Sequence, residues 1–274
     1  MALVYKKVLV IGATSGIGRE IARKVVEAGS SVIIVGRRKK NLDEFVNQYG
    51  GDKVKAKVFD VIQLKQLSLE IPQFVSEVIS EHPDIDCVFI NSGIQRPFNF
   101  TQSETVDLDI FDQELVTNYT APVYLTKAFL PHLQKQKSQG PTALVYTTSQ
   151  LALIPTTRAP NYGASKAALH HFILALRSQL STVNGPKVVE LFPPAVQTEL
   201  HDTKHQPDLK DGHLMGMPLD EYINETWSMF VQGEEQVVVA ASQGIFDAFE
   251  LKRQEIFHQR NEQAGRFMKR FLRE

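Results

Sequence analysis

The sequence predicts an α/β fold, a doubly wound parallel sheet of about seven strands with helices on both faces. Short apolar, β-branched runs recur at residues 7–11, 32–35, 54–59, 87–90, 143–147, 187–192 and 236–239. Several are apolar throughout, which is typical of strands covered on both faces. Amphipathic stretches alternate with them, among them residues 17–28, 73–81, 117–134 and 164–180. This alternation implies right-handed crossovers between parallel strands.

Composition narrows the class of protein. The 274 residues carry 30 Lys and Arg against 31 Asp and Glu, a formal charge of −1, which argues against binding nucleic acid through counterion release. The single cysteine, Cys87, excludes a disulfide framework and a cysteine-based metal site. No apolar stretch reaches the roughly 18 residues that span a bilayer, and residues 1–7 leave no room for a signal peptide before the first strand. We expect a cytoplasmic protein with no nucleic-acid, membrane or metal partner.

A glycine-rich turn follows the first predicted strand. Residues 12–18 read Gly-Ala-Thr-Ser-Gly-Ile-Gly, and a helical pattern begins at once. Gly12 permits a tight turn, Gly16 lets the backbone approach a pyrophosphate, and Gly18 allows close packing of helix on strand. The helix N-terminus offers free N–H groups to an anion. The predicted phosphate-binding residues are Gly12, Thr14, Ser15, Gly16, Ile17 and Gly18.

The spacing Gly-x-x-x-Gly-x-Gly resembles the turn of the short-chain dehydrogenase/reductase (SDR) family, in its classical branch. The resemblance implies one Rossmann domain over residues 1–274, with a cofactor half at about 6–118, a catalytic and substrate half at about 119–240, and a C-terminal helix at about 241–274. Two further stretches match the family's cofactor signals. Asp60 and Val61 follow the third strand, where the family places a carboxylate near the adenine. Asn91, Ser92 and Gly93 follow the fourth and resemble its Asn-Ala-Gly turn.

The end of the second strand favours NADP(H) over NAD(H). Dinucleotide folds specific for NAD usually place an acidic residue there, and this sequence has Gly36 followed by Arg37 and Arg38. A guanidinium group pairs well with a phosphate, such as the 2′-phosphate of NADP. Arg37, nearest the strand end, is the stronger candidate. Arg38 either stacks on the adenine or faces solvent.

Tyr162 and Lys166 stand four residues apart and therefore share one helix face. A tyrosine with its ordinary pKa near 10 is a poor base at neutral pH, and a nearby ammonium group lowers that pKa. Ser149 follows the fifth strand, where its hydroxyl can orient a substrate carbonyl. By resemblance to the family, Asn118 completes a catalytic tetrad with Ser149, Tyr162 and Lys166, and holds a water that links the lysine to solvent. Tyr162 and Lys166 also count among the cofactor-binding residues.

Residues 193–198 read Pro-Pro-Ala-Val-Gln-Thr, where the family usually has Pro-Gly-x-x-x-Thr. The resemblance assigns contacts with the nicotinamide carboxamide to Val196 and Thr198. Pro194 replaces the glycine, which fixes φ and removes an N–H. This Pro-Pro-Ala-Val-x-Thr form looks like an uncharacterised, NADP-preferring subgroup of the family.

Together these motifs predict an NADP(H)-dependent oxidoreductase that transfers a hydride between the nicotinamide and a small-molecule carbonyl or alcohol, with Tyr162 as general acid and base. The alternative is a non-catalytic NADPH-binding sensor or scaffold with the same fold. We expect a substrate pocket lined by residues 150–152, 94–98 and 201–218, with Arg96 near its mouth. Residues 201–218 form either a mobile lid or a plain surface loop. The resemblance further implies a homodimer or homotetramer.

Overall fold

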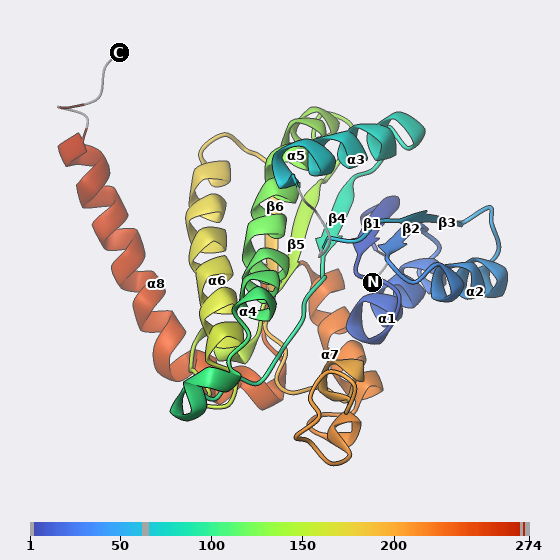
Figure 1. The fold of residues 1–274 in the computed structure, drawn as a ribbon. Helices are drawn as coiled ribbons and strands as arrows, with labels where there is room; N and C mark the ends of the chain where they lie inside the picture. Colours follow the sequence, from blue (N-terminus) through green and yellow to red (C-terminus); the bar gives the residue numbers. More distant parts are fainter. Residues whose placement is uncertain (1–2, 62–65, 269–270, 272–274) are drawn as a thin grey trace.

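Seven parallel strands form one sheet in the order β3-β2-β1-β4-β5-β6-β7, with helices on both faces (Figure 1). The computed structural model describes residues 3–61, 66–268 and 271. The doubly wound α/β fold predicted from the sequence is confirmed, and each predicted strand is present with ends that differ by two residues at most. The strands are β1 Lys7–Ile11, β2 Ser31–Gly36, β3 Val54–Val58, β4 Cys87–Ile90, β5 Ala143–Thr147, β6 Lys187–Leu191 and β7 Gln236–Val237.

Eight α-helices occur in the described part of the chain. The predicted stretches correspond to α1, α3, α5 and α6, whereas α2, α4 and α7 are additional. The C-terminal helix predicted over 241–274 is α8, which extends to Met268, and residues 269–270 and 272–274 lie outside the described residues. None of the described helices is long and apolar enough to cross a membrane. The helices are α1 Gly16–Glu27, α2 Lys39–Tyr49, α3 Leu67–Glu81, α4 Leu108–Leu115, α5 Ala121–Gln136, α6 Pro160–Ser181, α7 Leu219–Gln232 and α8 Ala240–Met268.

The core is divided by the sheet into two layers, because side chains alternate along each strand. Val8 and Val10 of β1 pack with α1, α2 and α7 on one face. Leu9 and Ile11 of the same strand pack with α3, α5 and α6 on the other. Burial on both faces explains why the strands are apolar throughout rather than alternating.

The site is positioned by the reversal of strand order at β1. This strand pairs with β2 on one side and β4 on the other. The connections leaving β1 and β4 therefore run to opposite sides, which opens a crevice at their carboxyl ends. Gly12 follows β1 and Asn91 follows β4, so both lie at this crevice.

A π-helical turn, Val116–Thr120, joins α4 to α5. The sequence predicts an ordinary helix beginning at residue 117, and this prediction is wrong in detail because the helix begins at Leu108 and widens for one turn. Thr117 donates its hydroxyl to Gln113 O at 2.7 Å. The turn buries Thr117 and Asn118 against the crevice. Such turns are frequent at functional sites.

Residues 199–216, which we call the lid, are folded rather than irregular. They contain the 3₁₀ turns Glu199–His201 and Gly212–Leu214. The two ends meet in a parallel bridge between Val196 and Met217, and Gln197 N donates to Met217 O at 2.9 Å. Gly216 has φ +94°, and a Cβ there would lie 2.2 Å from Ala195 O. The lid is thus closed at its base.

Buried charges hold α8 against the body of the protein. His170 of α6 lies between two carboxylates, with Nδ1 2.8 Å from Glu190 Oε1 of β6 and Nε2 3.1 Å from Glu250 Oε2 of α8. Burial opposes a charge on His170, but the two carboxylates outweigh it and raise the pKa of His170 to about 9. Farther along, Asn261 Nδ2 donates to Ser178 Oγ at 3.3 Å, so α8 runs beside α6 (Figure 1).

Candidate active site

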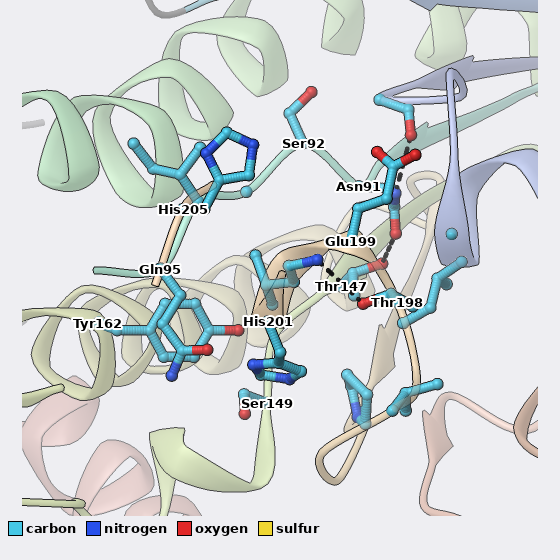
Figure 2. Close-up of a pocket in the computed structure, with 18 of the residues that line it drawn as sticks. Asn91, Ser92, Gln95, Thr147, Ser149, Tyr162, Thr198, Glu199, His201 and His205 are labelled. Carbon is cyan, nitrogen blue, oxygen red and sulfur yellow. Dashed lines mark hydrogen bonds between the residues drawn. The ribbon is translucent and has the colours of Figure 1, made fainter. Parts of the chain in front are cut away.

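A cavity of about 430 Å³ opens over the carboxyl ends of the central strands (Figure 2). The glycine turn and the end of β2 line one part, and Ser149, Tyr162 and Lys166 line another. Lid residues complete the wall, among them His201 and His205. One cavity therefore contains most of the predicted cofactor-binding residues and most of the predicted catalytic ones.

The turn after β1 accepts only glycine at its key positions. Gly12 has φ +89° and Gly16 has φ +53°, both in the left-handed region. A Cβ on Gly12 would lie 2.7 Å from Ser92 N, and one on Gly18 would lie 2.1 Å from Gly12 O. The turn leads directly into α1, whose first residues line the cavity and offer free N–H groups to an anion. These residues fit the pyrophosphate of a dinucleotide.

Arg38, rather than Arg37, lies against this turn. Arg38 Nη2 donates to Thr14 Oγ1 at 2.8 Å and to Ser15 Oγ at 2.5 Å. Its Nη1 forms an ion pair of 2.5 Å with Glu199 of the lid. Arg37 lines the same cavity but its side chain is exposed. The sequence predicts Arg37 as the stronger candidate for a phosphate contact, because it lies nearest the end of β2. In the structure it is Arg38, at the start of α2, whose guanidinium group contacts the glycine turn.

A chain of hydrogen bonds connects the glycine turn to Lys166. Asn91 Nδ2 donates to Gly12 O at 3.1 Å, and Thr147 Oγ1 donates to Asn91 Oδ1 at 2.8 Å. Lys166 Nζ then donates to Thr147 O at 2.8 Å. Figure 2 shows this chain across the cavity. The ends of β1, β4 and β5 are thereby fixed relative to α6.

Tyr162 and Lys166 share one face of α6, as their spacing predicts, with Lys166 Nζ 5.7 Å from the centre of the Tyr162 ring. The expected lowering of the tyrosine pKa is wrong for the chain by itself. Burial raises the pKa of Tyr162 above its ordinary value, the Ser149 hydroxyl offsets part of this, and Glu114 adds to it. Lys166 points to Thr147 rather than to the phenol, and burial lowers the pKa of Lys166 to about 8.

Ser149 caps the 3₁₀ turn Gln150–Ala152, accepting a hydrogen bond from Leu151 N at 3.1 Å. Ser149 lines the same cavity as Tyr162 (Figure 2). Asn118 lies behind the cavity wall. Its Oδ1 accepts from Ile94 N at 3.0 Å, and its Nδ2 donates to Ile94 O at 2.9 Å. The structure therefore assigns Asn118 backbone contacts that hold the loop after β4.

The other predicted cofactor residues also lie at the cavity. Asp60 and Val61 follow β3 and line the cavity. Val196 is buried in the bridge at the lid base. Thr198 packs near Gly16, since a Cβ on that glycine would lie 3.2 Å from Thr198 Cγ2. The remaining cavity-lining predictions are Gly12, Thr14, Ser15, Gly16, Ile17, Ser92 and Gly93, whereas Gly18 lies beneath the turn.

Side-chain contacts with other segments hold the lid over the cavity. Glu199 pairs with Arg38, and His205 Nδ1 lies 3.2 Å from an Arg96 nitrogen. Arg158, ahead of α6, pairs with Asp208 at 2.6 Å. His201, His205, Leu209 and Met215 of the lid line the cavity, which supports the lid interpretation over the plain loop. Of the predicted substrate-pocket residues, Ala152, Pro97, Phe98 and the rest of residues 201–218 do not line it.

Sequence reasoning missed several residues that shape the site. Thr147 and Glu199 stand next to predicted residues, yet their side-chain contacts depend on distant segments. Glu114 is buried one helical turn before Asn118, and its carboxylate binds Asn161, the neighbour of Tyr162. In the sequence, Glu114 could be singled out only because it stands four residues before Asn118 and so shares its helix face.

Known proteins resemble this chain over most of its length. The family described as short chain dehydrogenase matches residues 6–208. An oxidoreductase of Bacillus subtilis, DltE, itself uncharacterized, is 32% identical over 265 residues, covering 97% of this chain and 100% of its own length. The 7alpha-hydroxysteroid dehydrogenase of Bacteroides fragilis is 27% identical over 184 residues, 66% of this chain and 67% of its own.

Solved structures share the fold. A short-chain dehydrogenase from Sphingobium yanoikuyae in complex with NADPH has a TM-score of 0.75 at 23% identity, covering 92% of this chain and 95% of its own. A relative from Burkholderia phymatum in complex with NAD has a TM-score of 0.74 at 16% identity, covering 96% of each chain. With the family match over residues 6–208 and the ordered motifs in one cavity, the chain belongs to the classical short-chain dehydrogenase/reductase family, whose members are oxidoreductases acting on CH–OH or C=O groups.

Proposed function

We propose that this protein is an NADP(H)-dependent oxidoreductase that moves a hydride between the nicotinamide and the carbon of a carbonyl or alcohol. One observation carries the proposal. Ser149, Tyr162 and Lys166 line the same cavity as the glycine turn and Arg38. A reacting carbonyl group and a dinucleotide can therefore occupy adjacent parts of one site.

The residues that would hold the dinucleotide lie in order along the cavity. The N–H groups at the start of α1 would bind the pyrophosphate. Arg38, with the hydroxyls of Thr14 and Ser15, would bind the 2′-phosphate. Lys166 would bind the nicotinamide ribose, and Thr198 the carboxamide. When bound, the nicotinamide supplies the hydride or accepts it.

Tyr162, Ser149 and Lys166 divide the remaining work. The Ser149 hydroxyl donates to the substrate oxygen and holds the carbonyl in place. Tyr162 gives its phenolic proton to that oxygen in reduction and takes it back in oxidation. Lys166 has a pKa of about 8 because burial lowers it, so at neutral pH it would hold the nicotinamide ribose mostly as an ammonium group. General acid–base catalysis of this kind contributes about 10²- to 10⁴-fold in rate.

Arg38 supports the choice of NADP(H). It is the guanidinium group held at the turn by two hydroxyls, a geometry suited to a phosphate. The related structures contain NADPH in one case and NAD in another, so the preference rests on this side chain. Arg38→Ala should weaken NADPH more than NADH. Equal loss for both cofactors would contradict the assignment.

The decisive experiment compares Tyr162→Phe with the wild-type chain on a panel of aldehydes and ketones, followed at the NADPH absorbance band. We expect the variant to bind NADPH with little change and to lose at least about 10²-fold in turnover. Tyr124→Phe on α5, away from the cavity, is the control. Full turnover by Tyr162→Phe would refute the mechanism.

Binding of NADPH without turnover by the wild-type chain on any carbonyl would favour the alternative, a sensor or scaffold. The homodimeric or homotetrameric assembly, the cytoplasmic location and the division into halves at about 6–118 and 119–240 stay predictions. A sedimentation experiment tests the assembly.

A further inference from the structure

Glu114 is a buried carboxylate beside the active site that the mechanism above does not use. It lies on α4, one turn before Asn118, and is fully buried. An ionised carboxylate is costly to bury, and an apolar residue would fill the same space at no such cost. Its contacts indicate what the carboxylate does there.

Each oxygen of Glu114 holds a different segment of the active site. Oε1 accepts a hydrogen bond from Arg96 N at 2.7 Å, in the loop that follows β4. Oε2 accepts from Asn161 Nδ2 at 2.8 Å, at the start of α6. Asn161 directly precedes Tyr162. Glu114 thus ties the loop after β4 to the residue next to the proposed general acid.

Asn118 repeats this arrangement one turn later. It binds Ile94 of the same loop through both backbone groups, and its Nδ2 donates to Ser165 Oγ at 3.1 Å. Ser165 directly precedes Lys166 and donates in turn to Tyr162 O at 2.8 Å. Glu114 and Asn118 therefore hold the two α6 residues that stand immediately before Tyr162 and Lys166.

Glu114 also acts on the site through its charge. The groups that feel or exert this charge are Arg96 from the loop after β4 and Lys166 and Tyr162 from α6. A negative charge on Glu114 favours the Lys166 ammonium against the effect of burial. Burial raises the pKa of Glu114 itself to about 7, with the Arg96 and Asn161 hydrogen bonds limiting the rise.

We propose that Glu114 is a positioning residue of the active site, which fixes Tyr162 through its hydrogen bond to Asn161 and acts on Lys166 through its charge. This inference rests on the proposed function. It adds a buried acid to the Asn118, Ser149, Tyr162 and Lys166 set, one that touches neither substrate nor cofactor.

The first test does not need a substrate. The pKa of Lys166 is measured by NMR on protein labelled with ¹³C at the lysine ε-carbon, with Lys166→Arg to assign the signal. In Glu114→Gln we expect the Lys166 pKa to fall by about one unit, because a buried negative charge is lost. Asp112→Asn, an exposed carboxylate on the same helix, is the control and should leave it unchanged.

The second test uses turnover of whichever carbonyl compound the panel identifies. Glu114→Gln should reduce kcat at least about tenfold, because Tyr162 would no longer be held in position to transfer its proton. The affinity for NADPH should change less than about threefold. The wild-type rate should decline as pH falls through about 7, because protonation removes an acceptor and the charge, and this step should be absent from the variant. Glu114→Asp keeps the charge but shortens the reach, so it should lower kcat with the Lys166 pKa retained.

An unchanged Lys166 pKa in Glu114→Gln would overturn the proposal, as would a kcat equal to that of the wild type. A lower melting temperature with both values unchanged would assign Glu114 a role in packing only. If the wild-type chain reduces no carbonyl, the proposed function fails, and the Lys166 measurement still decides whether Glu114 controls that lysine.

Discussion

Replacing His170 by glutamine should destabilise the protein most near pH 6.5 and least near pH 9.5. The imidazole lies fully buried between Glu190 and Glu250, at 2.8 and 3.1 Å. Glutamine has a similar size and a donor group but carries no proton that titrates. The variant therefore removes the ionisation of this group while leaving the packing of α6 against α8 nearly intact.

The magnitude follows from the two pKa values of His170. The folded value is about 9, against an ordinary value of 6.5. Because the folded pKa is raised, the stabilising contribution is fully present below 6.5 and is lost as pH rises through 9. A difference of 9 − 6.5 = 2.5 units corresponds to about 3 kcal/mol.

The measurement is urea unfolding followed by circular dichroism at several pH values between 6.5 and 9.5. The difference in unfolding free energy between the wild type and His170→Gln should shrink by about 3 kcal/mol across this range. Hydrogen exchange along α8 adds a local measurement. When Glu250 loses its contact with residue 170, the backbone amides of α8 should exchange faster. Glu255→Gln, an exposed carboxylate on the same helix, is the control.

A difference that stays constant with pH would refute the reasoning, since it would mean that His170 is neutral in the folded protein. If His170→Gln does not fold, Glu250→Gln replaces it, because this variant keeps the Glu190 partner. It should reduce protection of α8 while the pH dependence becomes smaller.

Two further changes address the cofactor site. Gly18→Ala should lower NADPH affinity at least about tenfold and destabilise the fold by about 1–3 kcal/mol, because the new Cβ would lie 2.1 Å from Gly12 O. Calorimetry measures both the affinity and the stability. Gly244→Ala is the control, and because open space surrounds Gly244 this variant should be more stable by about 0.5–1 kcal/mol. Glu199→Gln should tighten NADPH binding several-fold, since Glu199 and the 2′-phosphate would compete for Arg38; weaker binding would show that the pair assists the cofactor.

The sequence predicted the fold well because the physical signals for it are local. Strands buried on both faces are apolar throughout. The turn after the first strand is recognisable because its glycines occupy positions where a Cβ atom would not fit. Tyr162 and Lys166 were found from a spacing of four on one helix. Such features depend on a few neighbouring residues and the ordinary geometry of helix and strand.

The remaining features depend on contacts between distant segments. Arg38, for example, contacts Thr14, Ser15 and Glu199, which lie on other segments of the chain. The π-helical turn at residues 116–120 could not be predicted, because no periodic pattern of apolar residues in the sequence marks so short a segment. The pKa of Tyr162 was expected to fall because of Lys166, whereas burial raises it, and burial is a property of the whole fold.

The closed base of the lid allows the segment between its two ends to vary at little cost in stability. The bridge of Val196 to Met217 fixes both ends of residues 199–216 close together, whatever the segment between them contains. Since the entropy of closing a loop grows only with the logarithm of its length, doubling the segment costs about 0.6 kcal/mol. Insertions in this segment should therefore be tolerated, while the bridge keeps Val196 in place and Thr198 stays beside Gly16.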